Sequence, residues 1–205
     1  MTREQRYAEA FKSRLTEKIQ TLLDDFATGK INRDQFHALY ERYSARLLIA
    51  DHALLSGNPD AVAIAESGPS TLQILEQTGG KALGLLIYDS ASAAIIETLG
   101  QFTVTADKVQ PLLADFMGTP HAENCVAQVD EQQWLLLVAG RFTTVVTLFK
   151  NEPSRLQTRE IERLHRDFEE ANHNALAQPM VDASKLGYPF LAFVQKKLGK
   201  ANHAR

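Results

Sequence analysis

The residues of this 205-residue chain best suited to metal binding are six histidines and a single cysteine. His121 and Cys125 lie four positions apart and could supply two ligands to one metal ion. A closed structural metal site needs four ligands at familiar spacings, and the sequence supplies no second pair. We therefore interpret His121 as a loop histidine and Cys125 as a strand residue that faces the core, and we expect no metal site.

A second candidate for chemistry is His165, which lies on the apolar stripe of a predicted helix together with Ile161, Leu164 and Phe168. A catalytic histidine needs a nucleophile within hydrogen-bond reach and a group that orients its ring. The spacing of the surrounding residues identifies neither group. We therefore expect His165 to be a partly buried and hydrogen-bonded histidine rather than a catalytic base.

The glycine pair before Lys81 and three pairs of adjacent carboxylates also fail to form a catalytic motif. A phosphate-binding loop ends in Gly-Lys-Ser/Thr and opens into a helix, whereas Lys81 leads into a predicted strand, so Gly79-Gly80 is interpreted as a turn that ends a helix. Adjacent residues on a helix point in different directions, which makes such pairs poor acid–base dyads. We interpret these pairs as solvated surface: Asp24-Asp25, Asp130-Glu131 and Glu169-Glu170. The sequence thus predicts no catalytic residue and no cofactor, and indicates a protein that is not an enzyme.

Two amphipathic helices are predicted at the N-terminus. Residues 4–27 carry apolar side chains at helical spacing: Phe11, Leu15, Ile19, Leu22, Leu23 and Phe26. The second helix starts at Asn32, which with Gln35 forms the pattern of a capping box. Its apolar stripe is Phe36, Leu39, Tyr40, Tyr43, Leu47 and Leu54. Because only a short link containing Gly29 separates the two helices, we predict an antiparallel helical hairpin.

Beyond residue 70 the apolar periodicity changes from helical to strand-like. We predict a helix at 71–78, strands at 82–88 and 94–99, a helix at 106–117, strands at 124–129, 133–139 and 141–149, and a helix from Ser154 that Pro179 breaks. The short links between the last three strands require antiparallel pairing. The predicted fold class is α+β, a sheet of about five antiparallel strands with flanking helices, preceded by the helical hairpin. The predicted organisation is a hairpin at 1–56, a linker at 57–70, an α/β domain at 71–177 and a basic aromatic tail at 178–205.

This order of elements resembles the roadblock/dynein-light-chain family, and more broadly the profilin-like and longin-like folds. The stretches that carry the resemblance are GLLIYDSASAAIIETLG at 84–100 and WLLLVAGRFTTVVTLFKNEPS at 134–154. The resemblance implies a dimeric interaction module, with a small Ras-like GTPase as one class of partner. GAF and PAS domains share similar pieces, and they leave open the alternative of a sensor that binds a small ligand inside the sheet.

Charge and composition limit the partners further. Residues 57–153 hold 4 basic and 11 acidic residues, whereas both flanking segments are slightly basic. An acidic sheet region repels phosphates, so we expect no nucleic acid. A single cysteine and the lack of a secretory signal fit a cytoplasmic protein.

The surface through which such a protein would act is predicted at one strand and in the tail. Unpaired backbone groups on the outer strands favour a homodimer. The possible interface residues are Trp134, Phe190, Phe193, Lys196 and Lys197. We expect the tail to dock on protein rather than to bind a membrane, because its few lysines and aromatic residues make a modest anchor.

Overall fold

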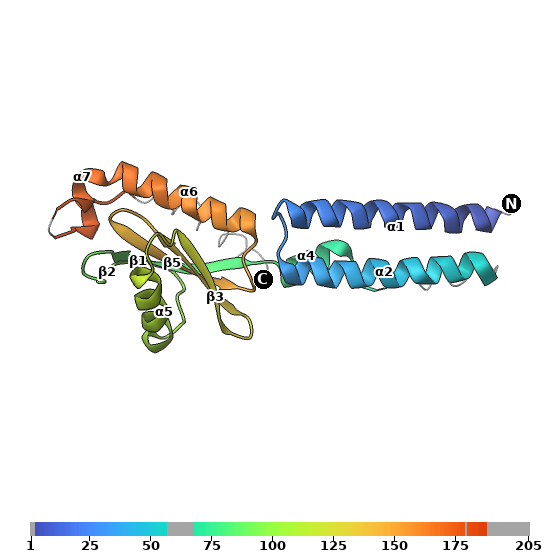
Figure 1. Ribbon diagram of the computed structural model, residues 1–205, viewed down its shortest axis with the longest axis horizontal. Helices are drawn as coiled ribbons and strands as arrows, with labels where there is room; N and C mark the ends of the chain where they lie inside the picture. Colours follow the sequence, from blue (N-terminus) through green and yellow to red (C-terminus); the bar gives the residue numbers. More distant parts are fainter. Residues whose placement is uncertain (1–2, 57–67, 179, 188–205) are drawn as a thin grey trace, which may run out of the picture. The chain divides into compact units, whose positions relative to one another are not determined.

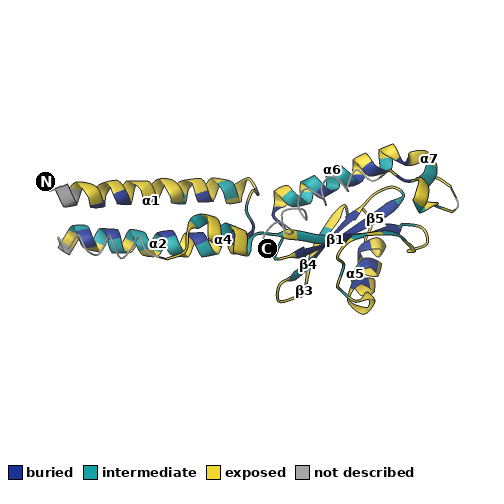
Figure 2. Cartoon of the chain, turned by 180° about the vertical axis from the view of Figure 1, so that it is seen from behind, coloured by how far each residue is buried: buried dark blue, intermediate teal, exposed yellow. Residues whose placement is uncertain are grey.

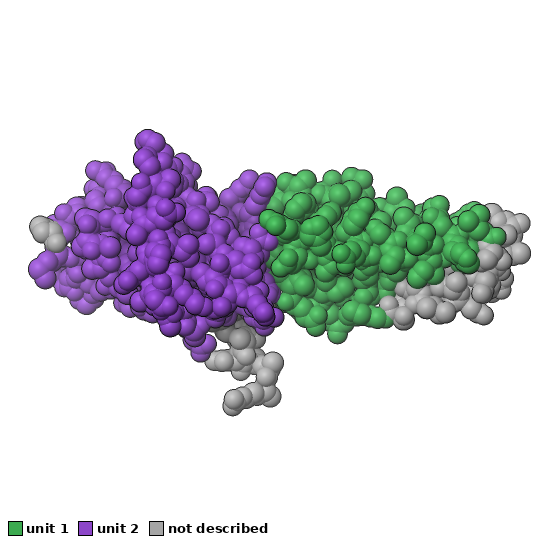
Figure 3. Space-filling view, turned by 60° about the horizontal axis from the view of Figure 1, so that its bottom comes forward, with its two compact units in different colours: residues 1–79 green, residues 80–205 purple. Residues whose placement is uncertain are grey.

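The computed structural model describes residues 3–56, 68–178 and 180–187. The chain divides into two compact units, residues 1–79 and residues 80–205, coloured separately in Figure 3. Figure 1 labels the helices and strands of both units. Residues 57–67 of the linker predicted at 57–70, and most of the predicted tail, lie outside the described residues.

The first unit is built on the predicted helical hairpin. Helix α1 spans Arg3–Ala27 and helix α2 spans Arg33–Ser56. The capping box is present, since the Asn32 side chain accepts from the Gln35 amide at 2.8 Å while the Gln35 side chain accepts from the Asn32 amide at 3.0 Å. The two helices run antiparallel (Figure 1) and bury a narrow seam of apolar side chains between them. The seam consists of Ala8, Phe11, Leu15, Leu22, Leu39, Tyr43, Ala50 and Ala53.

Helix α4, Thr71–Thr78, belongs to this helical unit, which corrects the predicted start of the α/β domain at residue 71. Three hydrogen bonds tie α4 to α2: from the Gln35 side chain to the Leu75 carbonyl, from the Asn32 side chain to the Thr78 carbonyl, and between the Tyr43 and Thr71 hydroxyls. Because polar groups of α4 form hydrogen bonds with the hairpin, the boundary between the two units falls after α4. The helix ends at Gly79, as the glycine pair predicted.

The second unit contains a five-stranded antiparallel sheet, which confirms the predicted fold class. The strands are β1 Lys81–Asp89, β2 Ile95–Gly100, β3 Asn124–Asp130, β4 Gln133–Ala139 and β5 Thr143–Lys150. Their order is β2-β1-β5-β4-β3, so that β1 and β5 pair in the middle although they are far apart in sequence. The edges of the sheet are β2 and β3.

Helices cover both faces of the sheet (Figure 1), which explains why its central strands are continuous apolar runs. Helix α5, Ala106–Gly118, packs Val109, Leu113 and Phe116 against one face. Helix α6, Arg155–Ala171, packs Ile161 and Phe168 against the other face. Buried positions, dark blue in Figure 2, concentrate on the central strands and on the helix sides that meet them.

The C-terminal helix ends earlier than the sequence pattern predicted. Helix α6 stops at Ala171 and is followed by the short helix α7, His173–Leu176, and by a single 3-10 turn at Ala183–Lys185. The buried Asn172 side chain donates to the carbonyls of Phe168 and Gly187 and accepts from the Gly187 amide. These hydrogen bonds compete with helix continuation, so Asn172 and not Pro179 interrupts the helix.

Candidate functional site

The clearest candidate for a functional surface is an apolar face on the helical hairpin. The described residues include twelve exposed large apolar side chains, and seven of them lie in the first unit: Tyr7, Leu23, Phe26, Tyr40, Leu48, Leu55 and Leu72. The sequence pattern assigned Leu23, Phe26 and Tyr40 to the packed stripes, but they are 40–41% exposed. Two helices and α4 bury only the narrow seam, so the flanking apolar residues stay at the surface.

Aromatic ring contacts join the exposed residues of the two helices into one surface. The Phe26 ring of α1 stacks on the Phe36 ring of α2 with 4.6 Å between centroids. Phe36 in turn stacks on Tyr40 at 5.5 Å. Leu23 precedes Phe26 by three positions, one helical turn, and therefore extends the same surface along α1.

The surface continues along α2 through two exposed leucines. Leu48 and Leu55 are eight and fifteen positions after Tyr40, which places all three on one side of the helix. These leucines are 71% and 89% exposed. Asp51 lies between them and forms an ion pair with Lys12 of α1, with 2.7 Å between Nζ and Oδ1. We call this surface the aromatic–leucine face: Leu23, Phe26, Phe36, Tyr40, Leu48 and Leu55, with the Lys12–Asp51 pair.

The α4 side of the hairpin has a different character. An open cavity of about 540 Å³ lies between α1, α2 and α4 over Leu22, Leu39 and Tyr43. Charged side chains also line it: Arg14, Glu17, Lys18 and Asp25. A partner that binds on the α4 side would therefore have to desolvate more charged side chains than one that binds on the aromatic–leucine face.

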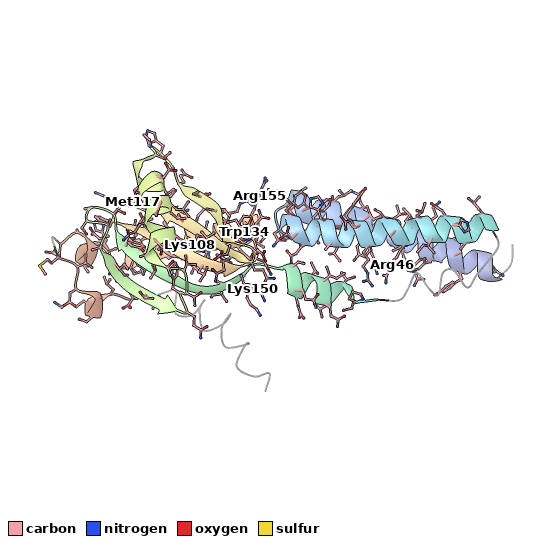
Figure 4. All side chains as sticks on the ribbon, turned by 90° about the horizontal axis from the view of Figure 1, so that it is seen from below. Arg46, Lys108, Met117, Trp134, Lys150 and Arg155 are labelled. Carbon is pink, nitrogen blue, oxygen red and sulfur yellow. The ribbon has the colours of Figure 1, made fainter. Side chains whose placement is uncertain are left out.

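The predicted interface residues fall in two places. Trp134 is half-buried in β4 opposite Phe149 and packs against the α6-side core. Figure 4 shows it at the same end of the sheet as Lys150 and Arg155, both exposed. The remaining four predicted residues lie outside the described part of the chain: Phe190, Phe193, Lys196 and Lys197.

The edge strand β3 offers a further exposed surface. Its residues alternate, with Cys125 and Val129 packed toward the α5-side core and Val126 and Gln128 exposed on the other face. Cys125 thus faces the core as predicted. His121 lies in the loop before β3 with a φ of 63° and is exposed.

A buried polar cluster connects α6 to the loop between β4 and β5. The Glu169 carboxylate accepts hydrogen bonds from the amides of Arg141, Phe142 and Thr143 at 2.8, 2.9 and 2.8 Å, and from the Thr143 hydroxyl at 2.8 Å. A side chain at Gly140 would collide with this carboxylate. The interpretation of Glu169 as solvated surface was therefore wrong, and its position four residues after His165, on the buried side of the helix, was the signal for its role.

The hydrogen bonds of Thr143 determine which ring nitrogen of His165 carries a proton. The Thr143 hydroxyl has one proton and donates it to Glu169, so it accepts from His165 Nε2–H at 2.8 Å. Burial lowers the pKa of His165 to about 4, and the nearby Glu169 carboxylate only partly offsets this. His165 is thus a neutral, hydrogen-bonded histidine at neutral pH, and the 3.7 Å contact with Glu169 is not an ion pair. The prediction that His165 is buried and hydrogen-bonded is confirmed.

Glu169 remains ionised in this setting. Burial by itself would raise the pKa of Glu169, but the hydrogen bonds from the Arg141 and Phe142 amides and from Thr143 outweigh it and hold the pKa below the ordinary value of 4.5. The cluster therefore fastens the β4–β5 loop to α6 through an anion with four donors, which is a positioning role.

One open cavity of about 570 Å³ lies at the loop end of the sheet. The β1–β2 loop contributes Asp89 and Ser92, the β4–β5 loop contributes Arg141 and Phe142, and the segment after α7 contributes Met180. Ser92 donates its amide and its hydroxyl to Asp89 at 2.7 and 2.6 Å, so these polar groups are engaged with each other. The volume lies in the range of small-molecule sites.

Within the part of the chain that the structure describes, no three histidine, cysteine, aspartate or glutamate side chains are grouped so that they could hold a metal ion. No helix in residues 3–56, 68–178 and 180–187 combines the length and the apolar character needed to cross a bilayer.

The sequence matches no protein-family model, and no curated protein is similar to it.

Proposed function

We propose that this protein is a cytoplasmic, non-enzymatic interaction or regulatory module that acts as a dimer. The observation that carries the proposal is the aromatic–leucine face of the hairpin. Large contiguous apolar patches are rare on the surfaces of monomeric proteins and mark sites of protein contact. A helical unit that leaves Leu48 and Leu55 exposed is therefore built to be covered by protein.

The partner class follows from the resemblance to roadblock-like domains. The resemblance rests on the order of elements from α4 to α6; the part from β1 to α6 lies within the sheet unit and supports a small Ras-like GTPase as the partner to be regulated. The candidate contact region on the sheet unit is the end that carries Trp134, Lys150 and Arg155 (Figure 4), where an aromatic side chain is accompanied by basic ones.

Binding of purified full-length protein to small GTPases encoded in the same genome tests this proposal. Each GTPase would be loaded with GDP or with a GTP analogue and titrated by isothermal calorimetry. We expect at least one to bind with a dissociation constant of about 10 μM or below, the weak end of specific complexes. The variant Trp134→Ala should weaken this binding at least about tenfold, the effect of losing an aromatic anchor. No binding by any GTPase in either nucleotide state would refute the partner assignment.

A sensor that binds a small ligand is the second candidate, and the open cavity near Phe142 and Met180 favours it. Native mass spectrometry of the freshly purified protein tests this function. A stoichiometric small molecule, lost in the variant Phe142→Ala, would support the sensor over the interaction module.

A further inference from the structure

We infer that the aromatic–leucine face is the surface through which two copies of this chain associate, with the two hairpins packing face to face and antiparallel as a four-helix bundle. The inference rests on the proposed function as a dimeric module and specifies the surface and the occupant. It assigns the dimer contact to the helical unit, not to the tail or to the edge of the sheet.

The first argument is that α2 is apolar on more sides than α1 and α4 cover. Leu39, Tyr43 and Ala50 face the buried seam. Leu48 and Leu55 lie on another side of the same helix and are 71% and 89% exposed. An amphipathic helix at a protein surface normally has one apolar stripe, and a helix with apolar residues on several sides is normally covered on each of them. The second stripe of α2 therefore needs a partner.

The second argument concerns charge, which favours a second copy over a charged partner. The charged groups within the face, Lys12 and Asp51, are already paired with each other at 2.7 Å. This pair adds no net charge to the face, and the exposed Glu41, seven positions before Leu48, lies on the same side of α2. The α4-side cavity is a poorer surface for this purpose, because association there would bury or crowd the charged side chains that line it.

The third argument is the shape of the face. Its two ends differ: one carries the stacked rings of Phe26, Phe36 and Tyr40, and the other carries Leu48 and Leu55. A twofold axis across the middle of the face places the aromatic end of each copy on the leucine end of the other. Every contact then occurs twice, as an isologous interface requires.

The fourth argument is size. Helices of 25 and 24 residues are about 36 Å long and each is about 10 Å wide, so the two together offer a footprint of about 700 Å² per copy. A stable interface buries about 800 Å² per partner, so the hairpin by itself is nearly large enough for a dimer.

Sedimentation equilibrium of the full-length chain tests the inference. We expect wild-type protein to have twice the 22.8 kDa chain mass at about 20 μM, and the double variant Leu48→Glu/Leu55→Glu to be monomeric, with its dimer dissociation constant raised at least about 100-fold. Both leucines are exposed and glutamate is a good helix former, so the helix content measured by circular dichroism should not change.

The control is Leu72→Glu, which places one negative charge on a 63% exposed leucine of α4, outside the face. This variant should dimerise within about threefold of wild type, since a surface change away from the interface has little effect. A second variant, Val126→Lys, places a charge on the exposed side of the edge strand β3 and should also remain dimeric.

Three outcomes would overturn the inference: a monomeric wild type at this concentration, a double variant that dimerises as wild type does, or loss of the dimer in Val126→Lys but not in the double variant. A monomeric wild type would also remove the dimer from the proposed function, whereas none of the three outcomes decides whether the protein binds a GTPase. Conversely, a chain that dimerises through this face without binding any GTPase would leave the inference standing and remove the partner assignment.

Discussion

The carboxylate of Glu169 allows a quantitative prediction for the variant Glu169→Gln. The glutamine oxygen can take the place of Oε1, but its amide group then faces the Arg141 N–H that Oε2 accepts at 2.8 Å. One hydrogen bond is lost, and the three others, from Phe142 and Thr143, no longer end on a charged acceptor. With about 1 to 2 kcal/mol for the lost bond and about 0.5 to 1 kcal/mol for each of the three weakened ones, the sheet unit should lose about 2.5 to 5 kcal/mol of unfolding free energy.

Urea unfolding followed by the fluorescence of Trp134 measures this change, because Trp134 is the single tryptophan and lies in the same unit. At a slope of about 2 kcal/mol per molar urea, the midpoint should fall by about 1.3 to 2.5 M. The matched control is Glu170→Gln, which removes the neighbouring, exposed carboxylate and should shift the midpoint by less than about 0.3 M.

The pH dependence of the same variant gives a second readout. A carboxyl group with a lowered pKa in the folded state stabilises above its unfolded value of 4.5, and this contribution is lost as the pH falls through the folded value. The difference between wild type and Glu169→Gln should therefore be constant near neutral pH and shrink in acid. Equal midpoints for the Glu169 and Glu170 variants at pH 7 would refute the reasoning.

Three further predictions concern the sheet unit. Between pH 6.5 and 4, buried His165 stays neutral while the unfolded chain takes up a proton, so the unfolding free energy should fall by up to about 3 kcal/mol as the pH falls. Urea titrations at several pH values should show that the unfolding free energy of His165→Gln depends less steeply on pH than that of wild type. The Thr147 hydroxyl is buried without a hydrogen-bond partner in the described structure, so Thr147→Val should raise the unfolding free energy by about 1 kcal/mol, which a higher melting temperature would reveal. A side chain at Gly84 would come within 2.6 Å of the Gln101 backbone, so Gly84→Ala should cost about 1 to 3 kcal/mol in the same urea assay, and an unchanged midpoint would contradict that contact.

The sequence by itself determined the elements of this protein and much of their order. Local signals were sufficient: the Asn32–Gln35 capping box and the helix predicted from Ser154 mark helix starts that the structure confirms. Short links imposed antiparallel pairing on β3, β4 and β5, because connections of two and three residues permit no crossover. These features depend on residues a few positions apart, and such interactions can be identified directly from a sequence.

Tertiary structure alone decided the features that depend on distant contacts. The pairing of β1 with β5 joins residues about 60 positions apart, as in Leu86 opposite Val146, and no local pattern specifies it. The assignment of α4 to the helical unit depends on Gln35 reaching Leu75, and the role of Glu169 depends on the amides of a loop 26 to 28 positions earlier. Helical periodicity likewise marks Tyr40 as apolar but does not tell whether any element covers it. Exposure is a property of the assembled unit, and it distinguishes the buried seam from the aromatic–leucine face.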